Sequence, residues 1–245
     1  MKKMLFALLM SATFALQAQK EEKIDYYTDS DVHRSIVSLQ VGYMPYYTSR
    51  RLLSQTANPQ ADYFFLNSAI TGKFGNGYGA DLLFSLNSNF QVGIGLYSTN
   101  THYQWDFVRI VSDIQGGNPD TLAVKKWDNY SSYLTVPIQF GFVSQVAEQW
   151  WLQVYPALEL NFLQSMKYDY VLADNTNVIV DKTQDARDLN MAINFGLGGE
   201  FRPMPKLGVF VRMNFRYFFY PNIEDEIVTE VIYTLGGHLG LRYYF

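Results

Sequence analysis

Cysteine is absent from the 245-residue sequence, and only three histidines occur. The lack of cysteine excludes disulfide bonds, thiolate metal sites, cysteine nucleophiles and a lipid-modified N-terminal cysteine. Neither sign of charge is in large excess, because the net charge is only −4, and no run of basic residues occurs. This balance argues against nucleic acid as a partner. Beyond Ala18 no apolar run reaches about 18 residues, so we expect no transmembrane helix in the mature chain.

The N-terminal residues have the pattern of a secretory signal. Lys2 and Lys3 make the start positive, residues 4–16 form a short apolar segment, and Ala18 is a small residue suited to cleavage. We therefore predict a signal peptide over residues 1–18, which is too short to span a bilayer comfortably. Residues 19–33 are polar and charged, and we expect them to form a short periplasmic lead-in.

Aromatic residues are abundant, at 17% of the chain, and apolar residues alternate with small or polar ones along most of it. Such alternation is typical of β-strands with two different faces. Eight segments show it, and they cover residues 34–48, 76–87, 90–100, 130–143, 149–163, 189–201, 207–220 and 234–245.

The connections between these segments alternate strictly between short and long. This alternation indicates an antiparallel up-and-down sheet with tight turns at one end and long loops at the other. We therefore assign residues 34–245 to one sheet. The short connections are 87–89, 144–148 and 202–206, and the long ones are about 49–75, 101–129, 164–188 and 221–231.

The polar side of the strands distinguishes a membrane barrel from a soluble one. The outer face of a soluble barrel meets water and should carry many Lys, Glu and Thr residues. Here the polar positions are instead rich in glycine, which suits the narrow lumen of an eight-stranded barrel. The apolar positions carry no charge and can face lipid. The sequence thus predicts an eight-stranded transmembrane β-barrel.

The aromatic residues fall into two bands along the predicted strands. Rings at both ends of an apolar band are what two membrane–water interfaces favour. The band at the short turns comprises Phe90, Phe142, Trp150, Phe201, Tyr243 and Phe245, and the band toward the long loops comprises Tyr43, Tyr46, Tyr47, Tyr130, Tyr217, Phe219 and Tyr233.

Three local features resemble the eight-stranded outer-membrane β-barrel family of Bacteroidetes, including its PorT-like branch. Residues 133–138, Tyr-Leu-Thr-Val-Pro-Ile, resemble that family's recurring Tyr-Leu-x-Ile/Val-Pro-Leu/Ile strand. Gln19 directly after the signal is a common mature start in such proteins, and the last strand is similar to their C-terminal assembly signal. The resemblance implies a barrel in the outer membrane of a Gram-negative bacterium with both termini periplasmic. For the PorT-like branch it also implies an association with protein secretion.

The closing segment carries the proposed insertion signal. Its outward positions end on an aromatic residue, which the outer-membrane assembly machinery could recognise, while outer-membrane lipids surround the strand. The residues of this signal are Leu239, Leu241, Tyr243 and Phe245.

Six charged residues share the inward positions of the strands, three acids and three arginines. Unpaired buried charge is costly, so we expect them to pair across a lumen that is closed to solutes. A gate or proton path is the alternative reading of this network. Its members are Asp81, Glu159, Glu200, Arg212, Arg216 and Arg242.

Candidate catalytic and metal-binding groups are few. Of the histidines, His33 precedes the first strand and His238 faces the lumen, while His102 lies near Ser98 and Thr99 just beyond the third strand. A lipid-hydrolysing site needs a histidine paired with a serine and oriented by a third group, and we expect His102 to be a solvated loop residue instead. Two acidic stretches, residues 25–31 and 224–226, lack the Gly and Glu of a calcium loop. We expect no metal, cofactor or catalytic residue.

The expected function is therefore that of a non-enzymatic scaffold or binding platform that acts through its long loops. A protein partner at these loops, or in a secretion assembly, is one alternative, and a membrane-embedded lipid hydrolase or acyltransferase is another. The loop over residues 101–129 holds Tyr103, Trp105, Phe107, Trp127 and Tyr130 around the turn Gly116-Gly117-Asn118-Pro119. We expect these aromatic residues to extend the sheet above the membrane, with contact to a partner as the alternative.

Overall fold

The computed structural model describes residues 36–54, 70–106, 109–110, 123–222 and 228–245. The compact unit over residues 35–245 holds all of the described strands. The predicted signal peptide and lead-in lie outside the described residues. The strands are β1 (Val37–Ser54), β2 (Ile70–Ser85), β3 (Phe90–Trp105), β4 (Arg109–Ile110), β5 (Ala123–Ala147), β6 (Trp150–Leu172), β7 (Asn177–Asp181), β8 (Leu189–Met204), β9 (Leu207–Phe218) and β10 (Val228–Tyr244).

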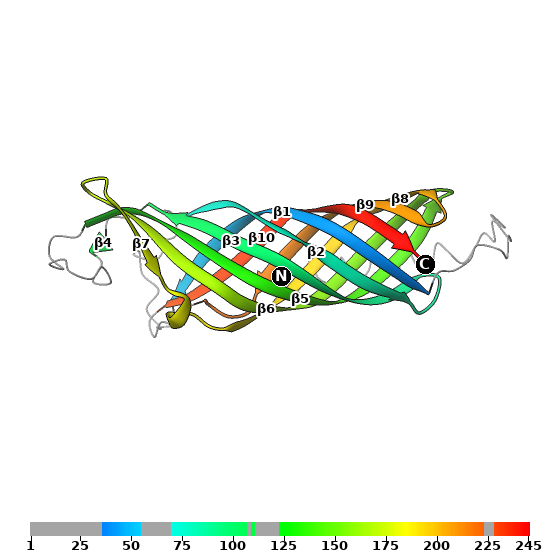
Figure 1. Ribbon diagram of the computed structural model, residues 1–245, viewed down its shortest axis with the longest axis horizontal. Coiled ribbons are helices and arrows are strands. Elements are labelled where there is room, and N and C mark those ends of the chain that lie inside the picture. Colours follow the sequence, from blue (N-terminus) through cyan, green and yellow to red (C-terminus); the bar gives the residue numbers. More distant parts are fainter. Residues whose placement is uncertain (1–35, 55–69, 107–108, 111–122, 223–227) are drawn as a thin grey trace. The chain divides into compact units, whose positions relative to one another are not determined.

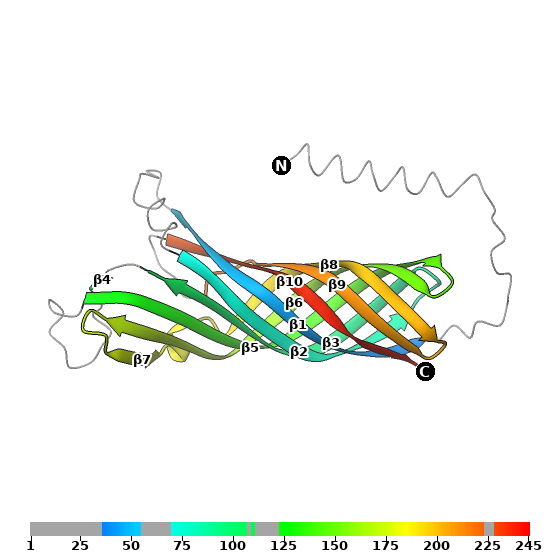
Figure 2. The ribbon, with the colours of Figure 1, turned by 90° about the horizontal axis from the view of Figure 1, so that it is seen from above.

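Eight of these strands close a tilted ring (Figures 1 and 2). Each pairs antiparallel with its neighbours in the order β5-β3-β2-β1-β10-β9-β8-β6, and β6 pairs back with β5. The first and last strands meet along their lengths, with Gln40 opposite Arg242 and Leu39 opposite Tyr243. Closure leaves the ring without an open edge, so its backbone groups are hydrogen-bonded within the sheet. The predicted eight-stranded up-and-down barrel is confirmed.

The ring strands run further than the sequence pattern predicts. Residues 101–105, 123–129 and 164–172 were expected in long loops but are paired strand residues of β3, β5 and β6. Their side chains include many aromatic and β-branched residues, which favour strands wherever a pairing partner continues alongside. The expectation that the aromatic residues of this loop extend the sheet is confirmed for Tyr103, Trp105, Trp127 and Tyr130. Phe107 and the turn at 116–119 lie outside the described residues.

The first residues of β5 and the last residues of β6, together with β4 and β7, form what we call the extension (residues 109–110, 123–129 and 167–181). β4 pairs with β5, and β7 pairs with β6, at the end of the barrel far from the C-terminus (Figure 1). The extension has its own apolar core, which includes Trp105 of β3 packed edge-on against Trp127 with their ring centroids 4.6 Å apart. The buried members of this core are Trp105, Val124, Trp127, Tyr170 and Leu172.

A tight turn joins β6 to β7 at the tip of the extension. Asn175 adopts the left-handed conformation with φ of 65°, which asparagine tolerates better than most residues. The Asp174 carboxylate accepts the backbone N–H of Thr176 at 2.9 Å, which holds the pKa of that carboxyl below its usual value. This turn chemistry lets the chain reverse within a few residues and lay β7 back along β6.

The barrel is apolar outside and polar inside. Large apolar side chains such as Leu96, Val211 and Met213 are exposed on the outer face at 55%, 62% and 67%. Their neighbours along each strand point inward and are buried polar residues, among them Gln40, Gln139 and Arg242. An exposed apolar belt around a closed ring is stable in lipid and not in water, so the described ring is a membrane-spanning barrel. Among the described residues, no helix is long and apolar enough to cross a bilayer.

Aromatic residues lie near both ends of the exposed apolar belt as predicted, with one exception. Near the short turns Phe90 packs on Phe142 and Trp150 packs on Phe201, with centroid separations of 4.5 and 4.9 Å. The assignment of Tyr46 to the other band is wrong, because its ring is buried in the lumen. Its hydroxyl lies 2.8 Å from the backbone carbonyl oxygen of Asn76 on β2 and 2.7 Å from that of Asn100 on β3, and it can donate its proton to one of them at a time.

The belt can be tested with a pair of lysine substitutions on β3. Leu96→Lys places a charge in the belt and should lower the free energy of unfolding by about 2–4 kcal/mol, whereas Asn100→Lys, exposed on the same face but four residues nearer the extension, where the side chain is already polar, should cost about 0–1 kcal/mol. Urea unfolding in phospholipid vesicles measures both. Equal losses in the two variants would show that this face does not contact lipid.

Candidate functional site

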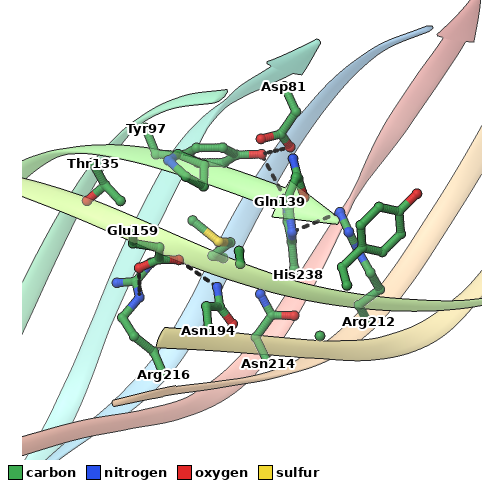
Figure 3. A pocket seen from close by; sticks show the side chains of 15 residues that line it. Asp81, Tyr97, Thr135, Gln139, Glu159, Asn194, Arg212, Asn214, Arg216 and His238 are labelled. Atoms are coloured by element: carbon green, nitrogen blue, oxygen red, sulfur yellow. Dashed lines mark hydrogen bonds and ion pairs between the residues drawn. The ribbon is translucent and has the colours of Figure 1, made fainter. Parts of the chain in front are cut away.

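The six predicted lumen charges all lie inside the barrel and are almost fully buried. They come from five different strands, β2, β6, β8, β9 and β10, whose inward positions share the lumen. Figure 3 shows four of them, Asp81, Glu159, Arg212 and Arg216. Their exposed fractions do not exceed 3%, so each charge needs a partner within the lumen. The network members are Asp81, Glu159, Glu200, Arg212, Arg216 and Arg242.

At the short-turn end, Glu200 is bound by two arginines. Its carboxylate lies 3.0 Å from Arg242 Nη1 and 2.8 Å from Arg202 Nε, and Gln153 and the Tyr244 hydroxyl also donate to it. The Arg202 guanidinium lies over the rings of Trp151 at 4.0 Å and Tyr244 at 4.3 Å, a cation–π arrangement. We call Glu200, Arg202, Arg242 and Tyr244 the short-turn cluster.

Arg202 is a member of this cluster that sequence reasoning missed. It was assigned to a connection, but β8 continues to Met204 and places it on the inward side with Glu200. The signal that could have found it is its spacing, because residues two apart on a strand share a face.

In the middle of the lumen, Glu159 and Arg216 form the predicted pair. Arg216 Nε lies 2.5 Å from Glu159 Oε2, and its Nη2 donates to Oε1 at 3.3 Å. Asn194 Nδ2 donates to the same Oε1 at 2.6 Å. Several donors on one carboxylate offset the cost of burying its charge.

The third expected pair does not form. Asp81 accepts hydrogen bonds from Gln40 Nε2 at 2.7 Å and from the Tyr97 hydroxyl, and neither partner is charged. Arg212 donates to His238 Nδ1 at 3.2 Å and lies over the Tyr155 ring at 4.5 Å. The prediction that every acid pairs directly with an arginine is therefore wrong for Asp81 and Arg212, because a histidine and a tyrosine stand between them.

Glycines make room for the buried carboxylates at two places. A Cβ atom at Gly208 would lie 2.2 Å from Glu200 Oε1, and one at Gly95 would lie 2.1 Å from Asp81 Oδ1. No side chain fits at such separations, so the carboxylates can fold against the wall only where the neighbouring residue is glycine. This contact accounts for part of the glycine-rich pattern on the inward side of the strands.

A small cavity remains beside the middle pair (Figure 3). The space open to the centre of a water-sized sphere is about 20 Å³, which suits one or a few water molecules. Six polar atoms of its lining residues are buried with neither a hydrogen-bond nor an ion-pair partner in the described part of the chain. These atoms are Asp81 Oδ1, Gln139 Nε2, Asn194 Oδ1, Arg212 Nε, Asn214 Oδ1 and Arg216 Nη1.

Toward the extension, the lumen is filled by apolar side chains. Tyr103, Ala192, Phe218 and Ile232 come from four strands and pack into one buried cluster. Beside them the Arg50 guanidinium lies over the Tyr103 ring at 5.0 Å. Side chains therefore occupy the lumen on both sides of the small cavity.

Metal-binding groups do not assemble in the described residues. Nowhere in the described ranges do three His, Cys, Asp or Glu side chains come close enough to hold a metal ion. The acidic stretches at 25–31 and 224–226 lie outside the described residues, as does His33.

His102 lies on the outer face of β3 and not in a loop, in contrast to the expectation. Its Nε2 atom is 3.1 Å from Asp128 Oδ1, and its ring stacks on Tyr130 with a centroid separation of 4.1 Å. Lys126 Nζ is 3.1 Å from the other oxygen of Asp128. Within the part of the chain that the structure describes, no serine or threonine hydroxyl is hydrogen-bonded to His102, so the pair has a histidine and an orienting acid but no nucleophile in contact.

The chain matches no protein-family model and no curated protein sequence. Among solved structures it is similar to the outer membrane protease OmpT from Escherichia coli, with 9% identity over 85% of this chain and 96% of that one and a TM-score of 0.43. It is similar to Neisserial surface protein A, with 9% identity over 86% and 98% of the two chains and a TM-score of 0.41. It is similar to the outer membrane protein OprG from Pseudomonas aeruginosa, with 9% identity over 85% and 95% and a TM-score of 0.41. At these values the fold assignment rests on the strand register and burial described above.

Proposed function

We propose that this chain is a non-enzymatic barrel of the Gram-negative outer membrane that presents its extension at the cell surface as a binding platform, with a lumen closed to solutes. The apolar belt and aromatic bands support the membrane location. The outward exposure of Leu239, Leu241, Tyr243 and Phe245 on β10 and just after it supports their role as a signal for the assembly machinery. In this orientation the short turns and both termini lie in the periplasm.

The packing of the lumen carries the first part of this proposal. The short-turn cluster, the Glu159–Arg216 pair and the apolar cluster around Tyr103 fill the barrel one after another. Each layer joins side chains from several strands, and on this basis we expect no continuous channel for an ion with its water shell. An eight-stranded barrel is narrow enough for side chains to fill in this way.

Planar-bilayer recordings test the closed lumen. Purified folded barrel at pH 7.5 should leave the current at the level of the bare bilayer, while a general porin added to the same bilayer confirms that insertion is detected. Stable, sizeable single-channel steps from this protein would contradict the proposal.

The extension supports the platform role. It holds its own buried core and keeps the tip of β7 in place, where Ile179 is 68% exposed. A rigid support that presents exposed side chains beyond the membrane is the usual arrangement of a binding surface. A subunit of a secretion assembly is the narrower form of the same proposal, since it too needs a protein partner at this end.

The absence of cysteine allows a direct test of orientation and partner together. Ile179→Cys on the extension should react in intact cells with a membrane-impermeant thiol crosslinker and give a discrete adduct with a partner protein. Val146→Cys, 66% exposed near a short turn, is the matched control and should stay unmodified until the outer membrane is permeabilised.

Other labelling patterns of the two cysteine variants would contradict either the orientation or the platform role. If Val146→Cys reacts in intact cells and Ile179→Cys does not, the orientation is reversed. If Ile179→Cys reacts without any protein adduct, the orientation is right and the platform role is wrong.

A lipid hydrolase or acyltransferase is a second candidate, because His102 and Asp128 form a histidine–acid pair on the outer face. Its weakness is the missing nucleophile noted above. We expect no hydrolysis of phospholipid or lipopolysaccharide acyl chains by the purified barrel, and the same background from His102→Ala. Acyl-chain release that disappears in His102→Ala but persists in His238→Gln would overturn the non-enzymatic proposal.

A further inference from the structure

Asp81 and Arg212 are joined through two neutral side chains. Arg212 Nη2 lies 3.2 Å from His238 Nδ1, and His238 Nε2 lies 3.4 Å from the Tyr97 hydroxyl. The Tyr97 hydroxyl donates in turn to Asp81 Oδ2. We call this chain of four residues, from β9, β10, β3 and β2, the relay, and Figure 3 shows its contacts as dashed lines.

The direction of each hydrogen bond in the relay follows from the groups at its ends. A guanidinium has only donors, so His238 Nδ1 must accept and carries no proton. The single imidazole proton is then on Nε2, where it points to the Tyr97 oxygen. The Tyr97 hydroxyl donates a hydrogen bond to Asp81, which as a carboxylate can only accept. All three bonds are satisfied only while His238 is neutral.

We propose that His238 is a proton-sensitive lock of the lumen, which joins Arg212 to Asp81 when neutral and releases Arg212 when it takes up a proton. A second proton would have to bind at Nδ1, where it would oppose an N–H of Arg212 at the distance of a hydrogen bond. Two donors and two positive charges would then face each other, and the contact would break. The ligand of the site is the proton, and the site does not depend on the platform role.

Among the described residues, the other surroundings of His238 add no acid that could hold the second proton. The Phe210 ring meets it edge-on at 4.9 Å from β9, and Gly42 of β1 leaves room for its Nε2 atom. Arg242 on its own strand and Arg216 on β9 are the further charges that act on it, and both are positive. The Tyr97 ring meets it edge-on, and Asp81 reaches it only through Tyr97.

The small cavity next to the relay can place water beside the released groups. Arg212, His238, Tyr97 and Asp81 all line it, together with the amide of Gln139. Its unpaired polar atoms can hold water, which supplies hydrogen bonds to the released guanidinium and a route for the proton. Acid should therefore loosen the contact between β3 and β9 across the lumen without a change in the outer belt.

The test compares wild type with His238→Gln across pH in phospholipid vesicles. Glutamine keeps one acceptor for Arg212 and one donor for Tyr97 but cannot be protonated. In the unfolded chain a histidine takes up a proton below about pH 6.5, whereas in the folded barrel an N–H donor of Arg212 occupies the Nδ1 atom that would receive this proton. The unfolding equilibrium constant of wild type, divided by that of His238→Gln, should therefore rise about tenfold per pH unit as the pH falls below about 6.5, and it should level off at the pH where the folded ring takes up its proton and releases Arg212.

His102→Gln is the matched control, because it removes the other histidine of the described region from outside the lumen. It should change the pH dependence less than His238→Gln does, because the His102 ring is only partly buried and an acid, Asp128, lies 3.1 Å from its Nε2 atom. A ratio between wild type and His238→Gln that stays constant from pH 7.5 to 5.0 would overturn the proposal, since carboxylates would then account for any acid effect.

A second measurement keeps the proposal testable if His238→Gln fails to fold. In the His33→Gln, His102→Gln background, His238 is the only histidine, and nitrogen NMR at pH 7.5 reports its protonation directly. We expect a neutral ring with the proton on Nε2. A proton on Nδ1, or a charged ring at this pH, would refute the relay.

Discussion

A sheet inside a bilayer has to pair the backbone groups of its two outermost strands, because lipid offers them no hydrogen bonds. Here β1 and β10 pair with each other from Ser38 opposite Tyr244 to Ser54 opposite Val228. Once that seam is closed, every ring strand has one face toward lipid and one toward the lumen. The inverted distribution of apolar and polar residues follows from this closure.

Because the ring is narrow, the side chains inside it are packed and shielded from solvent like those in the core of a soluble protein, although most of them are polar. Buried charges are stable there only with partners, and Glu159 with Arg216 and Glu200 with Arg242 and Arg202 meet that need directly. Asp81 and Arg212 meet it through His238 and Tyr97. An indirect connection through a titratable ring differs from an ion pair in one respect: it depends on the protonation state of that ring.

In the extension the sheet continues, and apolar side chains in place of charged pairs pack between its strands. Trp105, Trp127 and Tyr170 replace the charged pairs, since this end of the sheet can hold its strands together by apolar burial. The extension is thus held together by apolar packing that does not involve lipid. Its exposed side chains, such as Ile179, are presented on a support that is independently packed.

The alternation of the eight segments was enough to predict the barrel, the lipid-facing side and the six lumen charges, because a strand sends successive side chains to opposite faces. The strand ends were predicted less well, since pairing with a neighbour extends β5 and β6 where the alternation alone indicates loops. The same limit hid Arg202. Tyr46 was misplaced for a different reason, because its position in the alternation of β1 already matches the inward side. Which acid meets which arginine, and that His238 and Tyr97 stand between Asp81 and Arg212, was decided only by the tertiary structure. These contacts join residues far apart in the chain, and their distances depend on strand stagger and on glycines at the facing positions, which no single strand's pattern contains.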